Sequence, residues 1–188
     1  MRRIIEVLPC SIVDTGADAV VNASNPDAVL GGGVSRALFN ECGGDMLLKE
    51  MREKLEADFD GELSPDDCLV TSGGTSAKIR FVLHVPSVDY RDPRTSTAER
   101  VASSAEAALR SAATLAEKEG PLSVAFPLLG AGSGGLSAGV SMKAIVDGLR
   151  RFFKEEPEAP VTRVVFAVPE QDKYELVKKR LDELLVLR

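Results

Sequence analysis

The sequence of 188 residues contains no tryptophan, one histidine and three cysteines. Cys10, Cys42 and Cys68 form no CxxC pair, so the sequence indicates neither a disulfide framework nor a metal site. A catalytic thiol needs a nearby base, and His84 is the only histidine, so we assign no Cys/His nucleophile. We expect buried or half-buried, reduced thiols in a cytoplasmic protein.

Long apolar runs and an excess of positive charge are also missing. No run approaches the roughly 20 apolar residues of a membrane span. The N-terminal apolar run is short and broken by Glu6 and Pro9, so we expect neither a membrane anchor nor a signal peptide. The net charge is −6, from 23 basic and 29 acidic residues, which argues against broad electrostatic binding of nucleic acid. Binding of an anion would therefore depend largely on backbone N–H groups.

Apolar strand patterns alternate with helical patterns along the chain. The predicted strands are Ile4–Leu8, Ala19–Asn22, Cys68–Ser72, Phe81–Pro86, Ser123–Leu128 and Arg163–Val168. The predicted helices lie in Val34–Leu55, Thr97–Lys118, Ser137–Phe153 and Gln171–Leu187. This alternation predicts an α/β fold, a three-layer α/β/α sandwich with a mixed, largely parallel central sheet. The length fits a single domain over residues 1–188, which we expect to be a monomer without a cofactor.

Several residues mark the ends of these predicted helices. Gly43 and Gly44 predict a break between two helices. Ser96 and Glu99 have the spacing of a capping box. Ser137 is placed to cap the helix that follows it.

Glycine is concentrated in two loops, each of which follows an apolar strand and precedes a helix. The first glycine loop is Gly31–Gly33 and the second is Gly130–Gly135. Ligands of open α/β sheets bind outside the carboxyl ends of the strands, where helix N-termini and glycine-rich backbone favour phosphate. Two such loops at one sheet edge suggest a ligand with two phosphates. The alternative is that the glycines only form tight turns.

Two common nucleotide-binding motifs do not describe these loops. The sequence has no G-x-x-x-x-G-K-[ST] run, so the lysine of a P-loop is missing. GAGSGG at 130–135 matches G-x-G-x-x-G in spacing, but it comes late in the chain and does not follow the first strand.

The motifs instead resemble those of the macrodomain family, which binds ADP-ribose. The resemblance is carried by VVNASN with GGGV after it, by FPLLGAGSGG about a hundred residues later, and by both occurring in this order. It runs nearly end to end, through ALFNECGGDMLL, LVTSGGTSAKIRFVLHV and VVFAVPEQDKYELVKKRL.

The resemblance implies a set of ligand-binding residues. Asn25 would bind the distal ribose, the first loop would lie along the diphosphate and distal ribose, and the second loop would close over the diphosphate. Asn22 would be structural, and a turn-stabilising role is the alternative for Asn25. The implied residues are Ser11, Ile12, Asn25, Gly31, Gly32, Gly33, Val34, Gly130, Ala131, Gly132, Ser133, Gly134, Gly135 and Pro169.

The sequence departs from the family pattern at the ligand ends. Ser11 replaces an Asp that accepts a hydrogen bond from adenine, which puts selectivity for adenine in question. Gly134 replaces an aromatic residue beside the distal ribose, which implies a more open loop. Pro169 stands where an aromatic side chain often stacks on the base.

The hydrolase motif V-D-G-A-I-H of the best-known branch is also altered. Ser35 replaces its Asp and Phe39 replaces its His, so no catalytic residue is assigned. His84 is interpreted as a core or strand-end side chain. Asp14, Asp18 and Asp27 lie near the first loop and are either bases or plain surface charges.

The sequence therefore predicts a protein that binds ADP-ribose, either free, as the 1''-phosphate, or attached to a macromolecule. A weak ADP-ribosyl hydrolase activity is a further hypothesis. The alternatives are a nucleotide- or RNA-binding module, and a degenerate macrodomain that acts as an interaction scaffold. Binding is the better supported of the two, because the Asp and His of the hydrolase motif are replaced.

Overall fold

The computed structural model describes residues 3–92 and 94–186, and the predicted helix end at Leu187 lies outside them. A six-stranded sheet has the strand order β1-β6-β5-β2-β4-β3. Neighbouring strands are parallel except for β3, which is antiparallel to β4 at one edge. The strands are β1 Ile4–Leu8, β2 Ala19–Ala23, β3 Leu69–Ser72, β4 Phe81–Val85, β5 Leu122–Phe126 and β6 Val161–Ala167.

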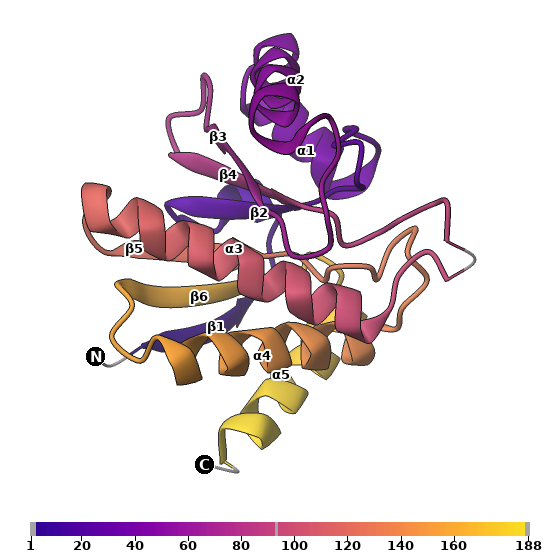
Figure 1. The fold of residues 1–188 in the computed structure, drawn as a ribbon. Helices are drawn as coiled ribbons and strands as arrows, with labels where there is room; N and C mark the ends of the chain where they lie inside the picture. Colours follow the sequence, from indigo (N-terminus) through magenta and orange to yellow (C-terminus); the bar gives the residue numbers. More distant parts are fainter. Residues whose placement is uncertain (1–2, 93, 187–188) are drawn as a thin grey trace.

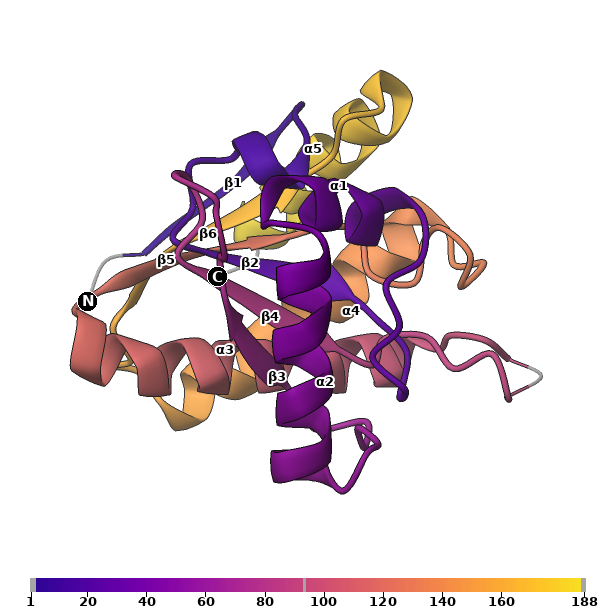
Figure 2. The same ribbon diagram turned by 90° about the horizontal axis from the view of Figure 1, so that it is seen from above.

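Helices cover both faces of the sheet, which confirms the three-layer α/β/α fold with a mixed, largely parallel sheet (Figure 1, Figure 2). One face carries α1 (Gly33–Glu41) and α2 (Asp45–Phe59). The other carries α3 (Ala98–Glu119), α4 (Ala138–Glu155) and α5 (Gln171–Val186). None of the helices within residues 3–92 and 94–186 is long and apolar enough to cross a membrane.

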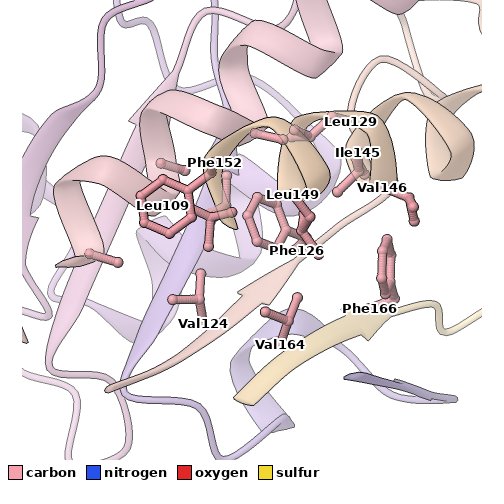
Figure 3. Packing of buried hydrophobic residues seen from close by; sticks show 14 of the residues in the cluster. Leu109, Val124, Phe126, Leu129, Ile145, Val146, Leu149, Phe152, Val164 and Phe166 are labelled. Atoms are coloured by element: carbon pink, nitrogen blue, oxygen red, sulfur yellow. The ribbon is translucent and has the colours of Figure 1, made fainter. Parts of the chain in front are cut away.

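Two apolar cores lie on the two faces of the sheet, and alternate residues of each strand enter one or the other. Val164 and Phe166 of β6 point toward α3 and α4, whereas Val165 and Ala167 join the core under α1 and α2. Figure 3 shows the first of these cores, where rings and branched side chains from the sheet and both helices interlock. A strand that is buried on both faces is apolar at every position, which explains the uninterrupted VVFAV run.

Helices α3 and α4 approach each other closely at Gly148. A Cβ added there would lie 2.9 Å from the Cβ of Ala105 and would also meet the backbone oxygen of Ala102. Small residues at the crossing therefore let the two helix backbones pack together.

The structure tests the helix break and the helix cap that the sequence predicted. The predicted break at Gly43 and Gly44 is confirmed, because both lie between α1 and α2. The capping box at Ser96 is wrong by one residue: Thr97 is the N-cap of α3, and its hydroxyl accepts from the N–H of Arg100. The Ser96 hydroxyl is buried and donates to the backbone oxygen of Ser87 at 2.7 Å.

Ser137 caps α4 as predicted, with its hydroxyl accepting from the N–H of Val140 at 3.3 Å. The predicted strand Ser123–Leu128 ends earlier, at Phe126. Pro127 has no N–H to donate to a neighbouring strand, so the sheet cannot continue through it.

Side chains of α2 cover the outer edge of β3. Lys54 Nζ donates to the backbone oxygen of Val70 at 2.7 Å, and the Glu50 carboxylate accepts from the backbone N–H of Ser72 at 2.9 Å. Glu50 also accepts from the Ser72 hydroxyl at 2.7 Å and pairs with Lys54 at 3.2 Å. Two backbone groups that face away from β4, the Val70 oxygen and the Ser72 N–H, thus have partners on a helix.

Candidate functional site

The two glycine loops meet because the strands before them are neighbours. β2 and β5 are adjacent and parallel, so the loops that follow them leave the sheet at the same edge. There they line one cleft made of two hollows, a first hollow of about 460 Å³ and a second hollow of about 350 Å³. The hollows share Gly33, Val34, Pro127, Leu128 and Gly132, so they form one elongated space.

The cleft brings together nearly all the residues that the sequence singled out. The first hollow is lined, among others, by Asn25, Gly31, Gly32, Gly33, Val34, Gly130, Gly132, Ser133 and Gly134. The second hollow is lined, among others, by Ser11, Ile12, Gly33, Val34, Ala131, Gly132 and Pro169. Gly135 lines neither hollow; its φ of 78° instead serves the turn, in which its N–H donates to the backbone oxygen of Gly132.

The backbone requires glycine at some positions of these loops and not at others. Gly33 and Gly130 have positive φ angles of 56° and 72°, which a side chain rarely adopts. Gly31, Gly32 and Gly132 do not have positive φ angles, and a Cβ added to any of them would meet nothing within 4 Å. Neither backbone conformation nor contact within the described chain therefore requires glycine at these three positions.

Helix α1 begins at the wall of the cleft. Its N-cap residue is Gly32, which offers no side chain to the helix, and Gly33, Val34 and Ser35 of its first turn line the first hollow. A helix N-terminus without a capping side chain presents unpaired N–H groups and the positive end of the helix dipole. The second glycine loop differs, because the N-terminus of α4 beyond it is capped by Ser137, which lines neither hollow.

Asn25 has a structural task as well as a place in the cleft. Its side-chain oxygen accepts from the N–H of Val29 at 2.9 Å, which holds the loop between β2 and the first glycine loop. The side-chain nitrogen makes only a 3.4 Å contact with Asp27. The turn-stabilising role is therefore present, and it leaves the NH2 group with a hydrogen to donate.

Ser35 and Phe39 stand at the two altered hydrolase positions, and neither side chain can act as a general base there. Ser35 is buried, and its hydroxyl donates to the side-chain oxygen of Asn22 at 2.9 Å. Phe39 lies half-buried against Gly44. Ser35 thus fastens the start of α1 to β2.

Asn22 and His84 continue this buried chain of hydrogen bonds across the sheet. The Asn22 side-chain nitrogen lies 3.0 Å from His84 Nδ1, and Thr71 Oγ1 lies 2.9 Å from His84 Nε2. If the Asn22 amide donates, Nδ1 accepts and Nε2 carries the proton. Burial lowers the pKa of His84 to about 3, so the ring is neutral near pH 7 and serves the fold.

The second hollow combines apolar walls with a paired charge at its rim. Ile12 is buried at its base and Pro169 is exposed at its edge. Lys173 also lines it, but its ammonium group is 3.0 Å from the Glu170 carboxylate, which lines the same hollow. The pair leaves little net charge there.

No Asp, Glu, His, Lys, Arg or Cys side chain is among the described residues that line the first hollow. The carboxylates considered as bases are all engaged outside both hollows. Asp14 pairs with Lys78 at 2.9 Å, and Asp27 contacts Asn25. The Asp18 carboxylate accepts from the Ser123 hydroxyl at 2.6 Å. Burial alone would raise the pKa of Asp18, but hydrogen bonds from Ser123 and the nearby Arg80 hold this pKa below its usual value.

The thiols do not supply a nucleophile either. Cys42 is buried and Cys10 and Cys68 are half-buried, as predicted. Burial raises the pKa of all three, that of Cys42 to about 11 and that of Cys68 to about 12, so they are protonated near pH 7. Within residues 3–92 and 94–186, no group of three His, Cys, Asp or Glu side chains is arranged to hold a metal ion.

Sequence reasoning missed one segment of the cleft, the loop between β4 and α3. Val88 and Tyr90 from this loop line the first hollow. Asp89 and Arg91 of the same loop line a separate hollow of about 350 Å³. The order of the strands accounts for this, because β4 is parallel to β2 and its carboxyl end lies at the same edge of the sheet.

Gly134 also differs from expectation. We expected the lack of a side chain there to open the second loop, but a Cβ at Gly134 would lie 2.5 Å from the backbone oxygen of Gly130 and 2.9 Å from Ser96 Cβ. The loop is folded tightly on itself at this point, and no side chain fits.

Comparisons with known proteins find relatives in sequence and a solved structure of the same fold. Residues 21–145 match the family model described as Macro domain. A protein of Aquifex aeolicus is 31% identical over 148 residues, which cover 79% of this chain and 82% of that protein. The O-acetyl-ADP-ribose deacetylase of Enterobacter sp. (strain 638) is 26% identical and covers 96% of this chain, with 95% of its own length matched.

A solved structure has the same fold. It is a mutant of the Oceanobacillus iheyensis macrodomain with ADPR, 23% identical in sequence, with a TM-score of 0.79. The match covers 96% of this chain and 92% of that one.

Proposed function

Since the chain belongs to the macrodomain family, we propose that it binds ADP-ribose, either free or as part of a larger ADP-ribosylated molecule, in the cleft between the two glycine loops. The diphosphate would lie across the residues that both hollows share. The adenine would occupy the second hollow and the distal ribose the first.

The observation that carries this proposal is the open space in front of Gly31, Gly32 and Gly132. Glycine there lowers stability through the flexibility of the unfolded chain. Nothing within the described chain requires it, because the φ angles are not positive and no atom lies within 4 Å of an added Cβ. A ligand that lies against the backbone would explain why these three positions are glycine.

The charges around the cleft fit a diphosphate that is held by backbone. Lys173 is the basic residue on the described lining of the two hollows, and it is paired with Glu170. The N-terminus of α1 and the glycine loops can supply N–H donors without a cation.

The first hollow offers polar groups to a ribose. The Asn25 NH2 group retains a hydrogen to donate. Ser24 also lines this hollow, and its hydroxyl is buried with no hydrogen-bond partner among the described residues. A buried hydroxyl without a partner is costly, and a ligand hydroxyl would satisfy it.

A second candidate function is hydrolysis of an ester on ADP-ribose, favoured by the name of the Enterobacter relative. The site gives it less support, because no carboxylate or imidazole among the described residues lines the first hollow to activate water. Incubation with O-acetyl-ADP-ribose, followed by chromatography, tests this candidate: release of acetate above the uncatalysed rate would establish it.

Calorimetric titration with ADP-ribose and with ADP tests the proposed binding. We expect ADP-ribose to bind about tenfold more tightly than ADP, because roughly 1.4 kcal/mol from contacts to the distal ribose corresponds to that ratio. Equal affinity for ADP, ATP and oligo(A) would instead indicate a general nucleotide- or RNA-binding module. Absence of binding by all of them would favour an interaction scaffold.

Gly132→Val is the matched variant for this titration. Its side chain would enter the open space that both hollows share, where an added Cβ has no atom within 4 Å, so the fold should be kept while the ligand path is blocked. We expect loss of ADP-ribose binding with an unchanged circular dichroism spectrum. Unchanged affinity would show that the ligand does not lie against the second glycine loop.

A further inference from the structure

Tyr90 reaches across the mouth of the cleft. It lies in the loop between β4 and α3, and its hydroxyl is 2.7 Å from the Ser133 hydroxyl of the second glycine loop. Both residues line the first hollow. Two loops from different strands are thus joined by one hydrogen bond above that hollow.

The base of the Tyr90 loop is held in place by the rest of the fold. Val88 is buried, and its N–H donates to the backbone oxygen of Ser24 at 3.3 Å. The Asp89 N–H donates to the backbone oxygen of Thr95 at 2.7 Å, which closes the loop. The Asp89 carboxylate is 3.0 Å from the Arg91 guanidinium. The position of Tyr90 is therefore set by neighbours on both sides.

The Tyr90 ring is available to a ligand. The side chain is 60% exposed although it stands at the cleft, so packing within the protein does not use most of its surface. It is the aromatic side chain on the described lining of the two hollows. The second glycine loop cannot provide one at Gly134, where the Gly130 backbone leaves no room for a Cβ.

We propose that Tyr90 is the residue that selects ADP-ribose over ADP. Its ring packs against the distal ribose in the first hollow, and its hydrogen bond to Ser133 holds the second glycine loop over the ligand. ADP ends at the diphosphate and does not reach this ring. The inference rests on the proposed binding of ADP-ribose in the cleft and names the residue that reads the distal sugar.

Titrations of Tyr90→Ala and Tyr90→Phe with ADP-ribose and ADP test this role. We expect Tyr90→Ala to reduce the preference for ADP-ribose over ADP about fivefold, because the loss of roughly 1 kcal/mol of contact with the ring corresponds to that ratio. Tyr90→Phe keeps the ring and loses only an exposed hydrogen bond, so the preference should fall by about threefold or less. Ser133→Ala should match Tyr90→Phe, because each removes one partner of the same bond.

Tyrosine fluorescence supplies a readout that a purely structural role would not change. The chain has two tyrosines and no tryptophan, so Tyr174→Phe leaves Tyr90 as the sole fluorophore of this kind. Tyr174 lies in α5 and lines neither hollow. In this background we expect ADP-ribose to change the emission more than ADP does at equal absorbance.

The outcomes separate this inference from the proposed function. If the unaltered protein binds ADP-ribose and Tyr90→Ala keeps the same preference over ADP, the role of Tyr90 is overturned and the proposed function stands. Equal emission changes with both ligands would also overturn it. If the unaltered protein binds neither ligand, the proposed function fails and the role of Tyr90 fails with it.

Discussion

The imidazole of His84 is buried between Asn22 and Thr71, and burial lowers its pKa from 6.5 to about 3. An unfolded chain binds a proton on this ring below pH 6.5, whereas the folded chain does not until about pH 3. Stability from the neutral ring is therefore fully present above pH 6.5 and falls as the pH falls below it. We expect a loss of about 2 kcal/mol in the free energy of unfolding between pH 8 and pH 5.

Urea denaturation at several pH values measures this loss. His84→Gln is the control, because an amide keeps hydrogen-bonding groups but does not titrate. The variant starts from lower stability, and its free energy of unfolding should change less between pH 8 and pH 5. Equal pH dependence in the two proteins would mean that the ring is protonated in the folded state.

At single residues, the sequence was most informative where local chemistry decides the outcome. The structural role of His84 could be predicted from its place in an apolar strand, and that of Asn22 was implied by the family resemblance. Tyr90 could not be found in this way. Its place at the cleft depends on how the loop after β4 is held by Ser24 and Thr95, and no local pattern records those contacts.

Among the elements, α3 and α4 give a test of close helix packing. In Gly148→Ala the new methyl group meets Ala105 and the Ala102 backbone, so we expect destabilisation of about 1–3 kcal/mol by overpacking. Gly139→Ala in the same helix meets only Leu176 Cδ2 at 3.7 Å, an ordinary contact. It should be stabilising by up to about 1 kcal/mol, because alanine favours helix more than glycine does.

Thermal or urea unfolding of the two variants compares these effects directly. Opposite signs are the expected result. Equal stability of Gly148→Ala and Gly139→Ala would contradict close packing at Gly148, because α3 and α4 would then move apart at little cost in free energy.

Element bounds followed from the sequence wherever a pattern or a breaker was local. The apolar run at Ile4–Leu8 and the glycines at 43 and 44 are such cases. The start of α3 shows the limit. Ser96 and Thr97 are both suitable N-cap residues. The Ser96 hydroxyl instead donates to the Ser87 backbone oxygen in the interior, so Thr97 caps the helix.

The charge of the whole molecule bears on how a diphosphate would be held. The protein carries a net charge of −6, and the lysine of the cleft lining is paired with a carboxylate. Salt should therefore weaken ADP-ribose binding little, because it screens repulsion as well as attraction. We expect the Kd to change by less than about threefold between 0.05 and 0.5 M NaCl.

Titrations across this range of salt concentration measure the effect. The paired substitution Lys173→Ala with Glu170→Ala removes the charges of the second hollow and should leave the flat profile in place. A Kd that rises tenfold or more with salt would contradict binding through backbone donors and point to a cation that contacts the phosphates.

The edge strand β3 has a consequence for the protein at high concentration. An edge strand with unpaired backbone groups can recruit a strand from another molecule and begin β-aggregation. Here the Val70 oxygen and the Ser72 N–H are already taken by Lys54 and Glu50. The Glu50 and Lys54 side chains thus oppose intermolecular sheet growth at this edge, and protonation of Glu50 in acid would remove the charge that pairs with Lys54.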